Sequence, residues 1–174
     1  SYNDAAVALA EHVSGSVEAF CAQMTAKASE IGAKDTVFGS PNGLDSQLSM
    51  EQHHSTAYDM ALIAAYALEN AEFSRVIAQP EISVTEIGGT HQCNVTNADR
   101  FLREYQGALG VKTGYTNKAG HCFVGAAERD GVRFVTAVLG SGWGNTGKEK
   151  KWTDTKALMD YGFATYQPYE TVQA

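Results

Sequence analysis

Apolar residues change their spacing at Pro80, and this change limits the possible folds more than any other feature of the chain. Before Pro80 they recur every three to four positions over residues 3–12 and 16–31, which predicts two amphipathic helices. Two further helices are expected over residues 56–70 and 71–78. The first half of the chain is therefore predicted to be helical, interrupted by an ordered loop.

After Pro80 the pattern is that of strands. Two short strands, 82–87 and 90–95, flank a pair of glycines and predict a hairpin. A central antiparallel sheet and two helices are expected over the following ranges: strands 108–113, 122–128 and 133–139, a short helix 98–105, and a closing helix 153–161. Helices, then strands, then a closing helix predict an α+β domain whose antiparallel sheet is flanked by helices.

Charge and hydropathy exclude several classes of function. The net charge is −7, and the densest basic stretch, Lys148, Lys150 and Lys151, is interrupted by Glu149, so we expect no nucleic-acid partner. No apolar run approaches the roughly 18 residues that a membrane-spanning helix needs. The length of 174 residues and 44% hydrophobic content suit one domain.

The possible metal ligands are scattered along the sequence. The five histidines include one adjacent pair but no HxxxH spacing: His12, His53, His54, His91 and His121. The three cysteines are widely spaced and are expected to be small buried apolar residues: Cys21, Cys93 and Cys122. We therefore predict no metal and no cofactor. Asp59, inside a predicted helix, is expected to have a structural role.

Two short motifs carry possible chemistry. Lys112-Thr113-Gly114 ends a predicted strand, and Ser1-Tyr2-Asn3 opens the chain. Each has an ordinary interpretation, a solvated lysine in the first and a helix N-cap in the second. Together, and in this order, they match two of the three elements shared by active-site serine enzymes that recognise penicillin.

Further blocks extend the match along the chain. They are Asn42-Gly43-Leu44, Ser55 to Ala61, Asn97 with Phe101-Leu102, Gly110 to Thr116, and Tyr161-Gly162-Phe163. Over nearly its whole length the chain resembles the low-molecular-mass D-alanyl-D-alanine carboxypeptidases. The resemblance implies a β-lactamase/transpeptidase-like fold with an all-helical part, incomplete here. Residues 1–167 would be the catalytic domain without its N-terminal segment, and 168–174 an exit linker.

The resemblance also implies roles in acyl transfer. Ser1 would hydrogen-bond the general-base lysine and pass a proton to the leaving D-alanine, and Asn3 would orient that lysine. Lys112 would supply positive charge beside Ser1, making these three the expected catalytic residues.

Substrate binding would fall to the residues that follow Lys112. Thr113, together with Lys112, would meet the substrate carboxylate, and Gly114 is expected to be a substrate-binding residue as well. The backbone N–H of Tyr115 would form half of the oxyanion hole. Lys151 stands where the family usually has arginine, so it is expected either to face the carboxylate or to be solvated.

The resemblance implies a nucleophilic serine in a Ser-x-x-Lys element, and the chain contains no Ser-x-x-Lys. The resemblance places that element upstream of Ser1, on a companion segment or polypeptide, and implies an exported enzyme that acts on peptidoglycan stem peptides and is acylated by β-lactams. Two alternatives stay open. One is a non-catalytic relative that binds peptidoglycan, and the other is a hydrolase that uses Ser1 as an N-terminal nucleophile.

Overall fold

The computed structural model describes residues 1–166. Four helices precede the first strand: α1 (Asn3–Ser14), α2 (Val17–Glu30), α3 (Ala57–Leu68) and α4 (Ala71–Ile77). All four confirm the sequence prediction, with ends that differ by two residues or fewer. Two begin at hydroxyl caps: Ser16 accepts the N–H of Ala19 and Thr56 accepts the N–H of Asp59, each at 3.1 Å.

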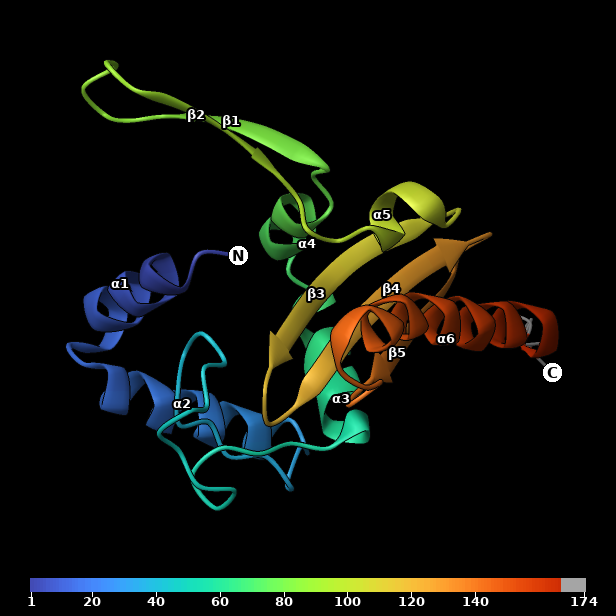
Figure 1. The fold of residues 1–174 in the computed structure, drawn as a ribbon, viewed down its shortest axis with the longest axis horizontal. Coiled ribbons are helices and arrows are strands. Elements are labelled where there is room, and N and C mark those ends of the chain that lie inside the picture. The colour runs from blue at the N-terminus through green and yellow to red at the C-terminus, as the bar shows by residue number, and fades with distance from the viewer. Residues whose placement is uncertain (167–174) are drawn as a thin grey trace, which may run out of the picture.

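Two separate antiparallel sheets follow. A hairpin of β1 (Glu81–Thr85) and β2 (Gln92–Thr96) projects from the body of the molecule (Figure 1). The central sheet has the order β3-β4-β5, formed by β3 (Ala108–Thr116), β4 (Gly120–Arg129) and β5 (Val132–Val138). Asp130 and Gly131 join β4 to β5 with φ values of 51° and 78°, as a tight hairpin requires. The sheet confirms the expected α+β class.

The last helix is longer than the sequence suggested. We expected it over residues 153–161, but α6 runs from Gly144 to Thr165. Its first turns lie in a glycine-rich stretch that is typical of a loop. Position 147 has no room for a side chain, because a Cβ on Gly147 would lie 2.2 Å from the carbonyl carbon of Gly142. The helix therefore begins directly against the preceding loop.

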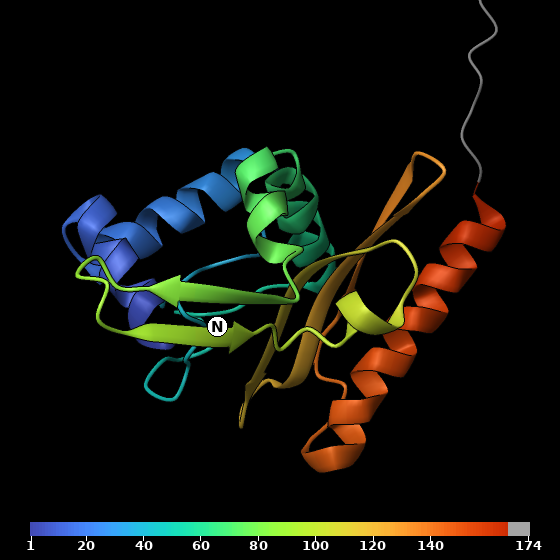
Figure 2. The same ribbon diagram turned by 90° about the horizontal axis from the view of Figure 1, so that it is seen from above.

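Helices cover both faces of the central sheet (Figure 2). α6 packs on β4 and β5 from one side, and α3 packs on them from the other. Phe101, Phe123 and Met159 are fully buried in the core on the α6 side. The short helix α5 (Phe101–Glu104) carries Phe101 and packs on β3. β3 is an edge strand that pairs only with β4.

The segment between α2 and α3 is an ordered loop, as expected. Val37 and His54 exchange backbone hydrogen bonds of 3.0 Å. Lys118, in the turn between β3 and β4, donates to the carbonyl oxygens of Asp45 and Leu48 at 2.8 Å each. Asp59 is 2% exposed and accepts hydrogen bonds from loop residues at 2.8 and 2.7 Å, consistent with the expected structural role.

The cysteines differ in burial. Cys21 is buried and Cys122 is half-buried, but Cys93 is exposed on the projecting hairpin, so its predicted burial was wrong. Within the described part of the chain, no helix combines the length and apolar character needed to cross a membrane. The expected exit linker, 168–174, lies outside the described residues.

Candidate active site

The register of the central sheet determines where the Lys112-Thr113-Gly114 motif points. Thr113 pairs with Phe123 of β4, and Lys112 pairs with Val124. Because side chains alternate along a strand, Thr113 lies on the same face as Phe123, towards α6. Lys112 leaves the strand on the opposite face, towards α3 and α4.

The edge of β3 exposes backbone groups at alternate residues. His121 donates its N–H to Gly142 and accepts from Ser141, both at 2.9 Å, so its backbone groups point away from β3. Its partner Tyr115 is therefore in a non-hydrogen-bonded pair. The N–H of Tyr115 accordingly points outward from the sheet edge, the direction required of an oxyanion-hole donor.

Lys151 reaches the motif from α6. Only 4% of Lys151 is exposed, and its Nζ donates to Thr113 Oγ1 and lies 4.6 Å from the centre of the Trp152 ring. Thr113 Oγ1 can in turn donate to the backbone oxygen of Cys122 at 3.5 Å. Of the two interpretations of Lys151, the structure rules out a solvated lysine.

Burial lowers the pKa of Lys151, with Cys122 and Asp99 opposing the shift and Lys112 adding to it. More than a third of Lys112 is exposed, and its Nζ donates to the carbonyl oxygen of Thr113. Desolvation of the ammonium lowers the pKa of Lys112 also, and Asp99 opposes this shift. Thr113 therefore accepts hydrogen bonds from two ammonium groups, that of Lys112 at its carbonyl oxygen and that of Lys151 at its hydroxyl.

Gly114 and Tyr115 extend this surface along β3. A Cβ at Gly114 would meet nothing within 4 Å, so the backbone there is open. The Tyr115 side chain is 46% exposed, and its ring centre lies 4.3 Å from that of His121. The expected substrate-binding residues therefore lie together on one strand edge, with Lys151 beside them.

Ser1 and Asn3 lie outside this cluster. Both are exposed, and within residues 1–166 no hydrogen bond joins either side chain to Lys112, Thr113 or Lys151. The N-cap of α1 is Tyr2, without a side-chain cap, so Ser1 does not act as the cap. In both views the first residue lies towards β3 rather than β5 (Figures 1 and 2).

Sequence reasoning missed Asp99, which lies just before α5. It is 2% exposed, and its Oδ1 accepts the N–H of Phe101 at 2.8 Å. Burial raises the pKa of the Asp99 carboxyl to about 6, against hydrogen bonds and nearby positive charges that lower it. An aspartate before a helical stretch is usually an exposed N-cap, so only its burial distinguishes it.

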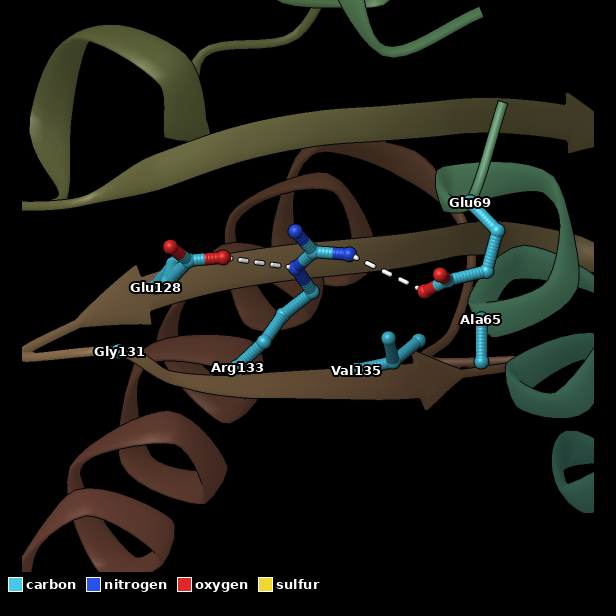
Figure 3. Close-up of a pocket in the computed structure, with 6 residues that line it drawn as sticks. All are labelled: Ala65, Glu69, Glu128, Gly131, Arg133 and Val135. Atoms are coloured by element: carbon cyan, nitrogen blue, oxygen red, sulfur yellow. Dashed lines mark hydrogen bonds and ion pairs between the residues drawn. The ribbon is translucent and has the colours of Figure 1, made fainter. Parts of the chain in front are cut away.

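A separate hollow lies at the other edge of the sheet (Figure 3). It is formed by α3 and the β4–β5 hairpin, where Arg133 reaches Glu128 at 2.8 Å and Glu69 at 3.4 Å. None of the expected site residues lines it. Within residues 1–166, no group of three His, Cys, Asp or Glu side chains is arranged to hold a metal ion.

Comparison with known proteins gives a family for the chain. Residues 1–142 match the family described as D-alanyl-D-alanine carboxypeptidase. The chain is 36% identical over 169 residues to D-alanyl-D-alanine carboxypeptidase DacF of Bacillus subtilis, covering 97% of this chain and 41% of DacF.

Solved structures show the same fold. A D-alanyl-D-alanine carboxypeptidase from Mycobacterium tuberculosis superposes with a TM-score of 0.82 at 37% identity, covering 98% of this chain and 62% of that one. A penicillin-binding protein from Listeria monocytogenes, in its ampicillin-bound form, gives 0.78 at 34% identity, with coverage of 92% and 62%.

The fold is that of the DD-peptidases and β-lactamases, a mixed α+β architecture. The chain belongs to the D-alanyl-D-alanine carboxypeptidase family. It spans less than two thirds of the length of the relatives it matches.

Proposed function

We propose that the protein containing this chain is a serine-type D-Ala-D-Ala carboxypeptidase. It would remove the terminal D-alanine from peptidoglycan stem pentapeptides through an acyl-enzyme, and β-lactams would acylate the same serine. One observation carries the proposal: Lys112, Thr113 and Lys151 meet at the open edge of β3, where the N–H of Tyr115 points outward. Membership of the family supports the same reaction.

The chemistry follows from these positions. The terminal carboxylate of the peptide binds at Thr113 between the two ammonium groups, which aligns the last peptide bond along β3. The N–H of Tyr115 stabilises the negative charge that develops on the scissile carbonyl oxygen. D-Alanine then leaves with a proton, and water hydrolyses the remaining ester.

The nucleophile lies on a segment outside these 174 residues, since the chain contains no Ser-x-x-Lys. We place Ser1 and Asn3 beside that segment, where Ser1 relays a proton to the leaving amine and Asn3 orients the base. The substrate is an extracytoplasmic polymer, so the protein would work outside the cytoplasmic membrane as an exported enzyme. Whether the nucleophile belongs to the same polypeptide or to a companion one is part of the test.

The test uses the complete protein that contains this chain. It is incubated with a fluorescent penicillin, every polypeptide is separated under denaturing conditions, and the labelled peptide is identified by mass spectrometry. We expect one covalent label on a serine outside residues 1–174. A label on Ser1 would instead establish an N-terminal nucleophile, and the absence of any label would favour a relative that only binds peptidoglycan.

A further inference from the structure

Two exposed aromatic side chains lie at the end of β3, beside the candidate active site. Tyr115 is 46% exposed, and Trp143, the residue before α6, is 59% exposed. Single exposed aromatic residues are common on protein surfaces and need no explanation. These two are distinguished by their hydrogen bonds, because the polar ends of both rings are attached to one residue, Asn117, in the turn between β3 and β4.

The hydrogen bonds to Asn117 fix the two rings relative to each other. The Tyr115 hydroxyl donates to Asn117 Oδ1 at 3.1 Å, and the indole Nε1–H of Trp143 donates to the backbone oxygen of Asn117 at 2.9 Å. The turn is itself anchored, since Thr116 Oγ1 donates to Asp45 Oδ2 at 2.8 Å. A phenol and an indole whose polar ends are satisfied present mainly apolar ring surface to a ligand.

The start of β4 supports both rings. The His121 imidazole packs on the Tyr115 ring, with the ring centres 4.3 Å apart. The Trp143 indole lies close to Gly120, where a Cβ would be 3.6 Å from it. The backbone N–H of His121 donates to the oxygen of Gly142 at 2.9 Å, which ties the residue before Trp143 to the same strand. The two exposed rings are therefore held in place before any ligand binds, which lowers the entropy cost of binding.

The proposed position of the substrate determines which part of it reaches these rings. Its terminal carboxylate lies at Thr113 and its scissile carbonyl at the N–H of Tyr115, so the peptide runs antiparallel to β3. An extended chain advances about 3.3 Å per residue, so the residue before the D-alanyl-D-alanine unit lies beyond Tyr115, in the direction of Asn117. Because Trp143 is attached at Asn117, the side chain of that substrate residue comes within reach of both rings.

We propose that Tyr115 and Trp143 form a subsite for the side chain of the substrate residue that precedes D-alanyl-D-alanine, and that this subsite favours a long aliphatic side chain. Such a chain lies across both rings and excludes water from them, whereas glycine at this position leaves the rings exposed. Neither ring takes part in acyl transfer. The inference rests on the proposed function and adds a substrate preference to it.

The experiment measures kcat/KM of the complete protein for two peptides that share the same D-alanyl-D-alanine end and an acetylated N-terminus. One peptide has Nε-acetyl-lysine before this end, and the other has glycine, so neither side chain is charged. The result is the ratio of the two kcat/KM values, acetyl-lysyl over glycyl. A general loss of folding or catalysis affects both values equally and cancels in the ratio.

Two variants test the subsite and a third is the control. Trp143→Ala removes one ring, and Tyr115→Thr removes the other while keeping a strand-forming residue and the backbone N–H of position 115. Tyr161→Ala is the matched control, since Tyr161 is 62% exposed towards the other end of α6.

The wild type is expected to prefer the acetyl-lysyl peptide by about tenfold, the equivalent of burying two methylene groups. Trp143→Ala and Tyr115→Thr should each lower this ratio by about fourfold, the equivalent of one methylene group. Tyr161→Ala should leave the ratio unchanged.

A wild type that cleaves the two peptides equally well would overturn the inference. A ratio that Trp143→Ala and Tyr115→Thr leave unchanged, or that Tyr161→Ala lowers as much, would overturn it too. Should one variant fail to fold, the other decides, and failure of both to fold would make the rings structural residues and refute the subsite. A wild-type protein that cleaves neither peptide would refute the proposed function itself, on which the inference rests.

Discussion

Replacing Asp99 by asparagine should make the protein more stable at neutral pH. The carboxyl is 2% exposed, and burial raises its pKa from 3.8 to about 6. Between these values the folded state binds more protons than the unfolded state, so stability falls as pH rises through this window and stays low above it. A shift of about two units corresponds to about 3 kcal/mol of destabilisation at pH 7.5.

The assay is urea unfolding of wild type and Asp99→Asn at pH 4 and pH 7.5. We expect the variant to be more stable by up to about 3 kcal/mol at pH 7.5, with the difference almost gone at pH 4, where folded Asp99 is already protonated. Asp160→Asn, at an exposed carboxyl of α6, should show no such gain. A variant that is equally or less stable at pH 7.5, or a difference that does not change with pH, would refute the reasoning about Asp99.

Three further outcomes follow from named contacts. Lys151→Ala should lower kcat/KM for the carboxylate substrate by about 30-fold or more, through loss of a buried charged hydrogen bond, whereas exposed Lys150→Ala should not. Phe101→Ala should destabilise the fully buried core by about 3–5 kcal/mol in urea unfolding, unlike Ile87→Ala on the exposed hairpin loop. Lys118→Met removes the donor to three loop carbonyls and should speed limited proteolysis within residues 39–52; an unchanged cleavage rate would contradict this role.

Much of the fold could be predicted because local pattern and final structure agree. The four N-terminal helices have regular apolar spacing, and hydroxyl caps mark the starts of α2 and α3. The three central strands alternate or are continuously apolar, and Asp130-Gly131 marks their hairpin. The start of α6 could not be predicted, because Gly144 and Gly147 are poor helix formers. Gly144 has a positive φ of 61°, and a Cβ at Gly147 would collide with the backbone of Gly142.

The candidate site was predictable only in part. Lys112 and Thr113 belong to a motif that can be recognised in the sequence. The burial of Lys151 and its hydrogen bond to Thr113 cannot be predicted from the sequence. Thirty-eight positions separate Lys151 from Thr113, and only packing of α6 on β4 brings the two side chains into contact. Ser1 and Asn3 remain predictions, because their roles depend on a segment that carries the nucleophile.

The sequence by itself determined the order of helices and strands, the antiparallel sheet and the family resemblance, since each depends on residues close together in the chain. Only the tertiary structure decided which charges meet. Asp99 looks like an ordinary helix-capping residue, and Lys151 looks like one of several lysines in a basic stretch. Burial shifts the pKa values of both side chains, up for Asp99 and down for Lys151. Desolvation changes the energy of a charge only after distant segments of the chain have excluded water around it.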